Sequence, residues 1–295
     1  MCSLQPANDP VRDVPLALTE DLLCIKCKLA PATINIRFAV YCDACFIDQV
    51  AHKFRVSVGK SRVSRQDRGN VLVFLDLERF PDASRVLFLL VLACVNEEQQ
   101  FRVKDRFTVA SFTPDPMIQA ECAKHDIPYI VLPFDMDVAG KDQRSCAQDM
   151  LFNEKLKILS QKAQELSIDK VYSPETCNDM AAVVFKLMIK GMGEIVPWEL
   201  QTVKKQLGMN IVRPLREHHD LEITEYLRLK GIRVSAKTFD KGLNGLTEAF
   251  FHNLDKDYSA TVSTVTKTAG KVDTVWMQLE CQCVHCGAPS MTDVC

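Results

Sequence analysis

Four short apolar segments, separated by stretches with helical periodicity, constrain the fold of this chain most. Each segment has the length and the Val, Ile, Phe and Tyr content of a buried strand. The segments are NVLVFLDLE (70–78), DRFTVASF (105–112), IPYIVLPF (127–134) and DKVYSPE (169–175). Strands joined by helices pair in parallel, and the helices cover the sheet. The sequence therefore predicts an α/β fold, a parallel sheet with helices on both faces.

Apolar stripes at helical spacing predict core positions on two of these helices. They consist of Leu156, Leu159, Ala163 and Leu166, and of Met180, Val183, Val184 and Leu187. The apolar run 86–95 predicts a buried helix, because a membrane-spanning helix needs about 20 residues. Ser173 as N-cap and Pro174 at the first helical position predict a helix start at the carboxyl end of a strand. Open α/β sheets bind ligands at that edge.

Two Cys-x-x-Cys pairs flank TINIRFAVY (33–41), a segment that is typical of a β-hairpin. A hairpin would bring the pairs together, and four thiolates in tetrahedral geometry suit a structural zinc ion with no open position for a substrate. The predicted ligands are Cys24, Cys27, Cys42 and Cys45. The alternatives are unmetallated core cysteines or a thioredoxin-like redox pair, although a redox motif needs one pair in a strand-helix context.

The redox state of the other cysteines follows from the first residues of the chain. They carry acids and prolines instead of the basic and apolar segments of an export signal, so we expect the 13 cysteines to stay reduced. For reduced cysteines that cluster in sequence, metal binding is a better interpretation than disulfide formation. Cys283 and Cys286 have knuckle spacing and are candidates for a second metal site, with Cys281, His285 and Cys295 close by in sequence.

A basic run follows the cysteine pairs directly, in HKFRVSVGKSRVSRQDR (52–68). The net charge of the whole chain is only −2, so nucleic-acid binding would need such a local patch. A basic stretch beside a zinc module fits a phosphate-contacting surface, whereas charge alone favours a solvated helix face. The candidate phosphate-contacting residues are Lys53, Arg55, Lys60, Arg62 and Arg65.

Two later segments complete the pattern. The segment 209–232 pairs a strand that ends at Arg213-Pro214 with an amphipathic helix that runs toward Gly231. The segment 257–272 is rich in Ser and Thr, a composition that predicts a linker or an exposed strand.

The motifs, taken in order, resemble the cytoplasmic tRNA 2-thiolation protein 2 family, the second subunit of cytosolic thiouridylase. The resemblance spans nearly the whole chain and is carried by CIKC, YCDACF, HKFRVSVGKSRV, VRPLREHHDLEITEYLRLKGI, SATVSTVTKT and CVHCG. It implies a cytoplasmic protein with a PP-loop ATP-pyrophosphatase-like fold beside a zinc module, in a heterodimer with the homologous first subunit. It also implies thiolation of carbon 2 of the wobble uridine (position 34) in tRNAs for lysine, glutamate and glutamine. The uridine would be activated as an adenylate, with sulfur from a thiocarboxylated ubiquitin-related modifier.

One turn departs from active PP-loop enzymes, in which the first strand runs into Ser-Gly-Gly-x-x-Ser. The turn DLERFPDASR (76–85) has no glycine, so side chains obstruct the approach of the backbone to a phosphate, and its acids repel ATP. The acids and the one matching serine are Asp76, Glu78, Asp82 and Ser84. The second nucleotide motif is reduced to Asn178-Asp179. We therefore expect no productive ATP binding and no catalytic residue in this chain.

Three functions and a domain division follow as hypotheses. The leading function is a non-catalytic subunit that binds the active homologue and helps to hold tRNA. The others are a tRNA-thiolating enzyme with an unusual nucleotide site, for which Cys122, Cys146 and Cys177 are candidate sulfur carriers without a neighbouring base in sequence, and a zinc-containing interaction or nucleic-acid-binding protein outside tRNA modification. No membrane partner is expected. The predicted divisions are 1–67 (N-terminal tail, zinc module and basic stretch), 68–235 (degenerate PP-loop ATPase-like domain) and 236–295 (C-terminal segment).

Overall fold

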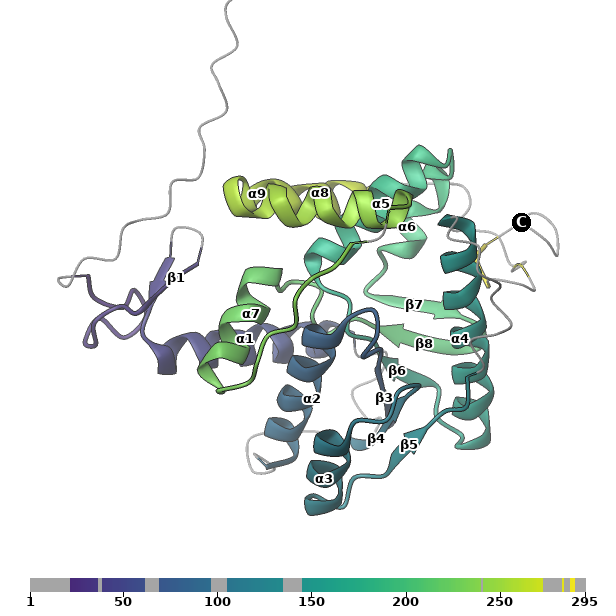
Figure 1. Ribbon diagram of the computed structural model, residues 1–295, viewed down its shortest axis with the longest axis horizontal. Coiled ribbons are helices and arrows are strands. Elements are labelled where there is room, and N and C mark those ends of the chain that lie inside the picture. The colour runs from purple at the N-terminus through teal and green to yellow at the C-terminus, as the bar shows by residue number, and fades with distance from the viewer. Residues whose placement is uncertain are drawn as a thin grey trace, which may run out of the picture.

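A six-stranded sheet lies at the centre of the computed structural model, with the strand order β5-β4-β3-β6-β8-β7 (Figure 1). The model describes residues 22–36, 39–61, 69–96, 105–134, 145–239, 241–272, 283 and 287–289. The strands are β3 (Asn70–Leu75), β4 (Arg106–Ser111), β5 (Tyr129–Val131), β6 (Lys170–Tyr172), β7 (Val203–Gln206) and β8 (Met209–Val212). All neighbours pair in parallel except β7 and β8, which are antiparallel. The predicted parallel sheet and its four predicted strands are confirmed.

Helices cover both faces of this sheet, because β3 is apolar on both of its faces. Val71, Val73 and Leu75 join one core, whereas Leu72 and Phe74 join the other. The first core is formed with α2 (Pro81–Asn96), α3 (Pro116–Lys124), α7 (Asp220–Leu229) and α1 (Asp43–Lys60). The second core is formed with α4 (Ser145–Glu165), on the opposite side of the sheet in Figure 1.

Both predicted apolar stripes contribute to buried cores. Leu156, Leu159 and Ala163 of α4 join the second core, whereas Met180, Val184 and Leu187 are buried with Val196 and Leu200. The run 86–95 lies in the buried helix α2. Among the described residues, no helix combines the length and the apolar character needed to cross a bilayer.

A third group of helices gathers beyond the carboxyl end of β6. It comprises α5 (Cys177–Ile189), α6 (Val196–Glu199), α8 (Leu243–Asp257) and α9 (Ser259–Ala269), with the short 3-10 helix η2 (Gly193–Ile195). Ala181 and Ala182 of α5 pack against Phe251 of α8 and Val262 of α9. Helices α8 and α9 of the predicted C-terminal segment therefore lie directly on a helix of the predicted central domain (Figure 1).

The predicted hairpin between the cysteine pairs is present. Strand β1 (Ile34–Ile36) pairs antiparallel with β2 (Ala39–Tyr41), and Ile34 lies opposite Tyr41. Helix α1 begins two residues after β2, so the second cysteine pair stands at its N-terminus.

The predicted start of α5 is wrong. Ser173 and Pro174 belong to an extended connection, and the N-cap is Thr176, whose backbone N–H and hydroxyl both donate to the Asp179 carboxylate at 2.8 Å. This reciprocal capping box outcompetes the Ser-Pro signal because it satisfies the free amide groups of the first turn.

The Ser/Thr-rich segment 257–272 was expected to be a linker or an exposed strand, and that prediction is also wrong. Residues Ser259–Ala269 form α9. Its hydroxyl groups donate to carbonyl oxygens of the preceding turn, as Thr264 Oγ1 does to Ala260 O at 2.8 Å. These hydroxyl groups therefore do not compete with the hydrogen bonds of the helix backbone. Val262 and Val265, three residues apart, face α5 and anchor the helix by burial.

Candidate functional site

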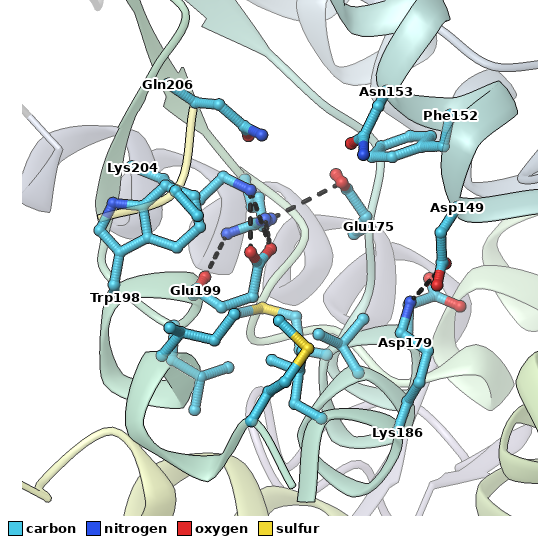
Figure 2. A pocket seen from close by; sticks show the side chains of 18 of the residues that line it. Asp149, Phe152, Asn153, Glu175, Asp179, Lys186, Trp198, Glu199, Lys204 and Gln206 are labelled. Atoms are coloured by element: carbon cyan, nitrogen blue, oxygen red, sulfur yellow. Dashed lines mark hydrogen bonds and ion pairs between the residues drawn. The ribbon is translucent and has the colours of Figure 1, made fainter. Parts of the chain in front are cut away.

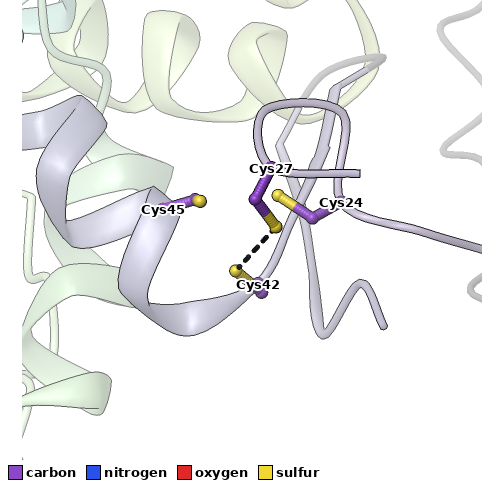
Figure 3. Close-up of side chains that lie close together, drawn as sticks. All are labelled: Cys24, Cys27, Cys42 and Cys45. Atoms are coloured by element: carbon purple, nitrogen blue, oxygen red, sulfur yellow. Dashed lines mark hydrogen bonds between the residues drawn. The ribbon is translucent and has the colours of Figure 1, made fainter. Parts of the chain in front are cut away.

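Four cysteines from two segments converge in front of α1 (Figure 3). Cys24 and Cys27 belong to the loop before β1, Cys42 is the N-cap residue of α1 and Cys45 lies in its first turn. Their sulfur atoms all lie within 4.8 Å of one another, and Cys27 Sγ and Cys42 Sγ are 3.9 Å apart. A tetrahedral zinc ion with Zn–S bonds of about 2.3 Å separates its sulfur ligands by about 3.8 Å. The four residues therefore fit a single tetrahedral metal ion.

The electrostatics of the cluster also fit a bound cation. Burial opposes ionisation of Cys24, but backbone amide groups around its sulfur outweigh that effect and lower its pKa to about 6. Hydrogen bonding with Cys42, burial and the other thiols raise the pKa of Cys45 to about 12. Four thiolates this close repel one another unless a cation neutralises them.

The pair at the C-terminal end is only partly described. Cys283 is buried, and its carbonyl oxygen accepts a hydrogen bond from Gly287 N at 2.7 Å. A Cβ atom on Gly287 would lie 3.1 Å from Leu207 N, and Gly287 has a φ of +71°, so this position requires glycine. Cys286 lies outside the described residues, and the second metal site stays a prediction.

The degenerate nucleotide turn lies where it was predicted, between β3 and α2. The carboxyl ends of β3 and β6 are neighbours at the switch point of the strand order, the place where open α/β sheets bind ligands. A pocket of about 140 Å³ opens there, which is small beside the 300–1,000 Å³ of typical ligand sites. Its charged lining consists of the carboxylates Glu78, Asp82, Asp179, Asp220 and Glu248 and the cations Arg79 and Lys237.

Ion pairs connect this turn to the helices α4 and α8. Lys155 of α4 lies 2.7 Å from Glu78 and 3.6 Å from Asp76, which is 3% exposed. Arg79 lies 3.2 Å from Glu248 of α8. The Lys155 ammonium holds the pKa of Glu78 below its ordinary value, so Glu78 is anionic near neutral pH. The charged side chains of the turn that line the pocket are thus paired with α4 and α8.

Asp82 and Ser84 lie at the start of α2. The Asp82 carboxylate accepts hydrogen bonds from Ser235 N at 3.0 and 3.2 Å and fixes the segment after α7. Ser84 is fully buried within the first turn of α2.

The reduced second motif also has structural partners. Asn178 Oδ1 accepts from Asp220 N at 3.1 Å, and Asp179 belongs to the cap of α5. Burial and the Asp220 carboxylate raise the pKa of Asp179 to about 7, although Lys237 and Thr176 oppose them. This acidic pair disfavours a polyphosphate in the pocket.

The described part of the basic run is a helix face that is partly engaged in ion pairs. Lys53 pairs with Glu222 of α7, and Arg55 lies 3.2 Å from Asp48 of the same helix. Lys60, the last residue of α1, is exposed. Arg62 and Arg65 lie outside the described residues.

The same helix face borders a cavity of about 320 Å³ that the sequence did not predict. The cavity lies between α1, the 213–219 connection and α9. Its charged and titratable lining consists of His52, Lys53, Lys60, Arg216, Glu217, His219 and Lys267. Cys177, the first residue of α5, also lines it. Sequence analysis found no base beside Cys177, because His219 is 42 positions away and only the fold brings the two together.

The other candidate sulfur carriers have different surroundings. Cys122 of α3 is buried, and burial raises the pKa of its thiol to about 11. Cys146 lies in α4, but its side chain is not among those that the structure describes.

A further pocket of about 250 Å³ lies on the other side of Asp179 (Figure 2). At one end Lys204 donates to both oxygens of Glu199 at 3.0 Å and stacks 4.7 Å from the Trp198 ring. At the other end Lys186 lies 3.0 Å from Asp149. Burial opposes ionisation of Glu199, but Lys204 and Arg213 hold its pKa below the ordinary value. These pairs tie α6 to the β7–β8 edge and α5 to α4.

Comparison with known proteins confirms the predicted resemblance. The sequence profile of the family described as "Cytoplasmic tRNA 2-thiolation protein 2" matches residues 242–294. The protein of that name from Drosophila pseudoobscura pseudoobscura is 24% identical over 90% of this chain and 76% of its own length. The Schizosaccharomyces pombe protein of that name is 26% identical over 50% of this chain and 41% of its own length.

A solved structure has the same fold. It is described as the "U34-tRNA thiolase NcsA from Methanococcus maripaludis with its [4Fe-4S] cluster". It superimposes with a TM-score of 0.68 over 92% of this chain and 93% of its own, at 18% sequence identity. The chain therefore shares the fold of this structure.

Proposed function

We propose that this chain, which resembles cytoplasmic tRNA 2-thiolation protein 2 along most of its length, is a non-catalytic subunit of a tRNA-thiolating complex. The observation that carries this proposal is the β3–α2 turn. At the switch point, Lys155 pairs with Glu78 and Arg79 pairs with Glu248 in a small acidic pocket. A phosphate cradle needs glycine so that backbone amides can close on the anion, and this turn has no glycine. The Arg79 and Phe80 amides already donate to Asp76.

The chemistry then falls to a homologous subunit with an intact nucleotide turn, which this chain would join as a heterodimer in the cytoplasm. The reaction is the 2-thiolation of uridine 34 in tRNAs for lysine, glutamate and glutamine, with sulfur from a thiocarboxylated ubiquitin-related modifier. The names of the relatives and the fold shared with a U34-tRNA thiolase support this assignment.

The cysteine cluster holds zinc in this proposal. Support comes from the distances between the sulfur atoms, which all lie within 4.8 Å of one another, with Cys27 Sγ and Cys42 Sγ 3.9 Å apart. In a [4Fe-4S] cluster each cysteine binds a different iron, which keeps the ligand sulfurs farther apart. The zinc would have a structural role, because four cysteines leave no open position.

The basic run would contact tRNA phosphates through Lys53, Arg55, Lys60, Arg62 and Arg65. Lys60 is exposed at the end of α1 and supports this role best. The ion pairs of Lys53 and Arg55 give these two residues a structural role as well.

Reconstitution tests the proposed function. The purified chain, the homologous subunit and both together are supplied with ATP, magnesium, a sulfur donor and unmodified tRNA, and 2-thiouridine is measured. We expect full thiolation only with both chains, and substitutions in the nucleotide turn of the homologue should abolish it. Thiolation by this chain alone would instead establish the enzyme hypothesis. If deletion of the gene leaves 2-thiouridine unchanged, the chain acts outside tRNA modification.

A further inference from the structure

The cavity of about 320 Å³ between α1 and α9 has an excess of positive charge. Lys53 borders it and pairs with the buried Glu222 of α7. His219 also borders it and lies 2.7 Å from the buried Asp255 of α8. The described lining contains one carboxylate, Glu217 of the 213–219 connection. The remaining cations of the lining are Lys60 of α1, Arg216 of the connection and Lys267 of α9.

None of these three cations forms an ion pair with a described residue. Arg216 is partly buried, and its guanidinium donates to two neutral acceptors, Thr202 Oγ1 at 3.2 Å and Leu200 O at 3.0 Å. Other N–H donors of the guanidinium are left for an anion. Lys60 and Lys267 are exposed. Charges of one sign around a cavity repel one another, and an anion that enters it relieves this repulsion.

Helix position explains the two lysines only in part. Lys60 and Lys267 each stand in the last turn of a helix, where a cation offsets the helix dipole. That effect does not explain why two helices that are distant in sequence bring these lysines to one cavity. It also does not apply to Arg216, which belongs to the connection after β8. An anion-binding site accounts for all three positions.

The lining also indicates which part of a nucleic acid the cavity suits. Ammonium and guanidinium groups bind phosphate oxygens through charge-assisted hydrogen bonds. Phe, Tyr and Trp are not among the described lining residues, so the cavity offers no such aromatic face for base stacking. Its volume is at the lower end of the range for ligand sites. The cavity therefore suits a backbone phosphate better than a nucleotide with its base.

We infer that this cavity seats one phosphate of an RNA backbone, bound by Lys60, Arg216 and Lys267. The choice of RNA rests on the proposed role in tRNA thiolation, and the choice of phosphate rests on the lining. The site continues the basic run, because Lys53 and Lys60 belong to both. Backbone contacts position a nucleic acid without reading its sequence. This chain would then orient tRNA for the chemistry of the homologous subunit.

Lysine acetylation tests the site without any substitution. The full chain, alone and in the assembled complex, is acetylated with and without unmodified tRNA, and each lysine peptide is quantified by mass spectrometry. We expect tRNA to protect Lys60 and Lys267. Lys124 of α3, away from α9 in Figure 1, should react equally with and without tRNA. Equal reactivity of Lys267 in the two samples overturns the inference.

Charge substitutions test whether the two lysines bind the same phosphate. Lys60→Gln and Lys267→Gln should each weaken tRNA binding by roughly 5-fold at physiological salt. The double variant should flatten the slope of log affinity against log salt by about one unit in total, because loss of either lysine already releases the phosphate. Lys267→Arg should keep the wild-type affinity, and Lys124→Gln should change neither quantity. Flattening by about two units in the double variant would assign the lysines to separate phosphates and overturn the shared site.

Two further probes separate an RNA backbone from other anions. Inorganic pyrophosphate and polyglutamate are titrated into the wild type and into Lys267→Gln at the same salt concentration. We expect no saturable micromolar binding of either probe that depends on Lys267. Such binding of pyrophosphate would identify a site for a free phosphate compound, and such binding of polyglutamate a site for an acidic protein segment. Either result overturns the RNA assignment.

Failure of this inference is distinguishable from failure of the proposed function. If the chain is required for 2-thiouridine but the double variant binds tRNA as the wild type does, the cavity does not hold the RNA backbone, while the subunit role stands. If tRNA protects Lys60 and Lys267 but deletion of the gene leaves 2-thiouridine unchanged, the RNA site stands and the proposed function fails.

Discussion

Lys155 Nζ of α4 lies 2.7 Å from Glu78 Oε2, so a helix from one face of the sheet fixes the turn after β3. The same ammonium is 3.6 Å from the buried Asp76 carboxylate and 5.5 Å from the centres of the Phe112 and Phe134 rings. Tertiary contacts therefore hold the turn in its conformation, and no bound phosphate is needed to order it.

Replacing Lys155 by Met should destabilise the protein by about 3 kcal/mol, because it leaves the Asp76 carboxylate buried without its cation. The matched control is Lys157→Met on the same helix, whose partner Glu154 is exposed, and it should cost less than about 1 kcal/mol. Urea unfolding measures both. Equal effects of the two substitutions would contradict a structural role for the Lys155 cluster.

ATP should not bind productively to the isolated chain. The acidic lining of the switch-point pocket and its small volume both oppose a triphosphate. Isothermal titration with ATP and magnesium should show no saturable heat, and the double substitution L77G/E78G should not create a working enzyme. Micromolar binding that disappears when Asp76 or Ser84 is mutated would support the enzyme hypothesis.

One zinc ion should be present at the four-cysteine cluster. Replacing Cys24 or Cys45 by Ser should release this metal and loosen the segment before α1, whereas Cys94→Ser in α2 should leave it bound. Elemental analysis gives the metal and its stoichiometry. A folded, active preparation with iron or with no metal at these four cysteines would disprove the zinc assignment.

The sequence predicted most of the fold, because the strands that form the sheet carry their signal locally. The segments 70–78, 105–112, 127–134 and 169–175 each contain a strand. The prediction from sequence failed at α9, where burial of Val262 and Val265 against α5 overrides a composition that is weak in helix formers. Such burial depends on partners from distant segments, which a local pattern does not contain.

The candidate sites also differ in whether the sequence could predict them. The Cys24–Cys45 cluster was predictable because spacing and a hairpin bring its ligands together within 22 positions. The cavity around Cys177 was not, because it is assembled from α1, α5, the 213–219 connection and α9.

Removing the charge of Lys60 by Lys60→Gln should weaken tRNA binding by the assembled complex. The slope of log affinity against log salt concentration should flatten by about one unit for each phosphate that the variant no longer neutralises. Lys162→Gln, on α4 at the opposite face of the sheet, is the matched control and should change neither quantity. An unchanged salt slope for Lys60→Gln would show that this end of the run is only a solvated helix face.

Lys53 should behave differently from Lys60. Its partner Glu222 has a side chain only 7% exposed, and Lys53→Gln leaves that carboxylate without its cation. We expect a loss of stability of about 1–3 kcal/mol in addition to any effect on tRNA. Thermal or urea unfolding of the free chain separates the two effects, because it requires no tRNA.

The stability of the folded chain should fall as the pH rises from about 7.5 to above 9, through the titration of His219. The pKa of His219 is about 9 when folded, above its ordinary value of 6.5. The unfolded chain therefore binds fewer protons than the folded chain across this window, and the stabilising contribution is complete below pH 6.5 and disappears as the pH rises through 9. A shift of this size corresponds to at most about 3 kcal/mol. Asp179, with a pKa of about 7, titrates mainly below this range, but the Cys122 thiol, with a pKa raised to about 11, also lowers stability within it, so the contribution of the histidine is the difference between the wild type and His219→Gln. His219→Gln should flatten the profile, whereas His125→Gln, at the C-cap of α3, should retain it. A wild-type stability that stays constant between pH 7.5 and 9.5 would mean that the His219–Asp255 pair is not charged in the folded protein.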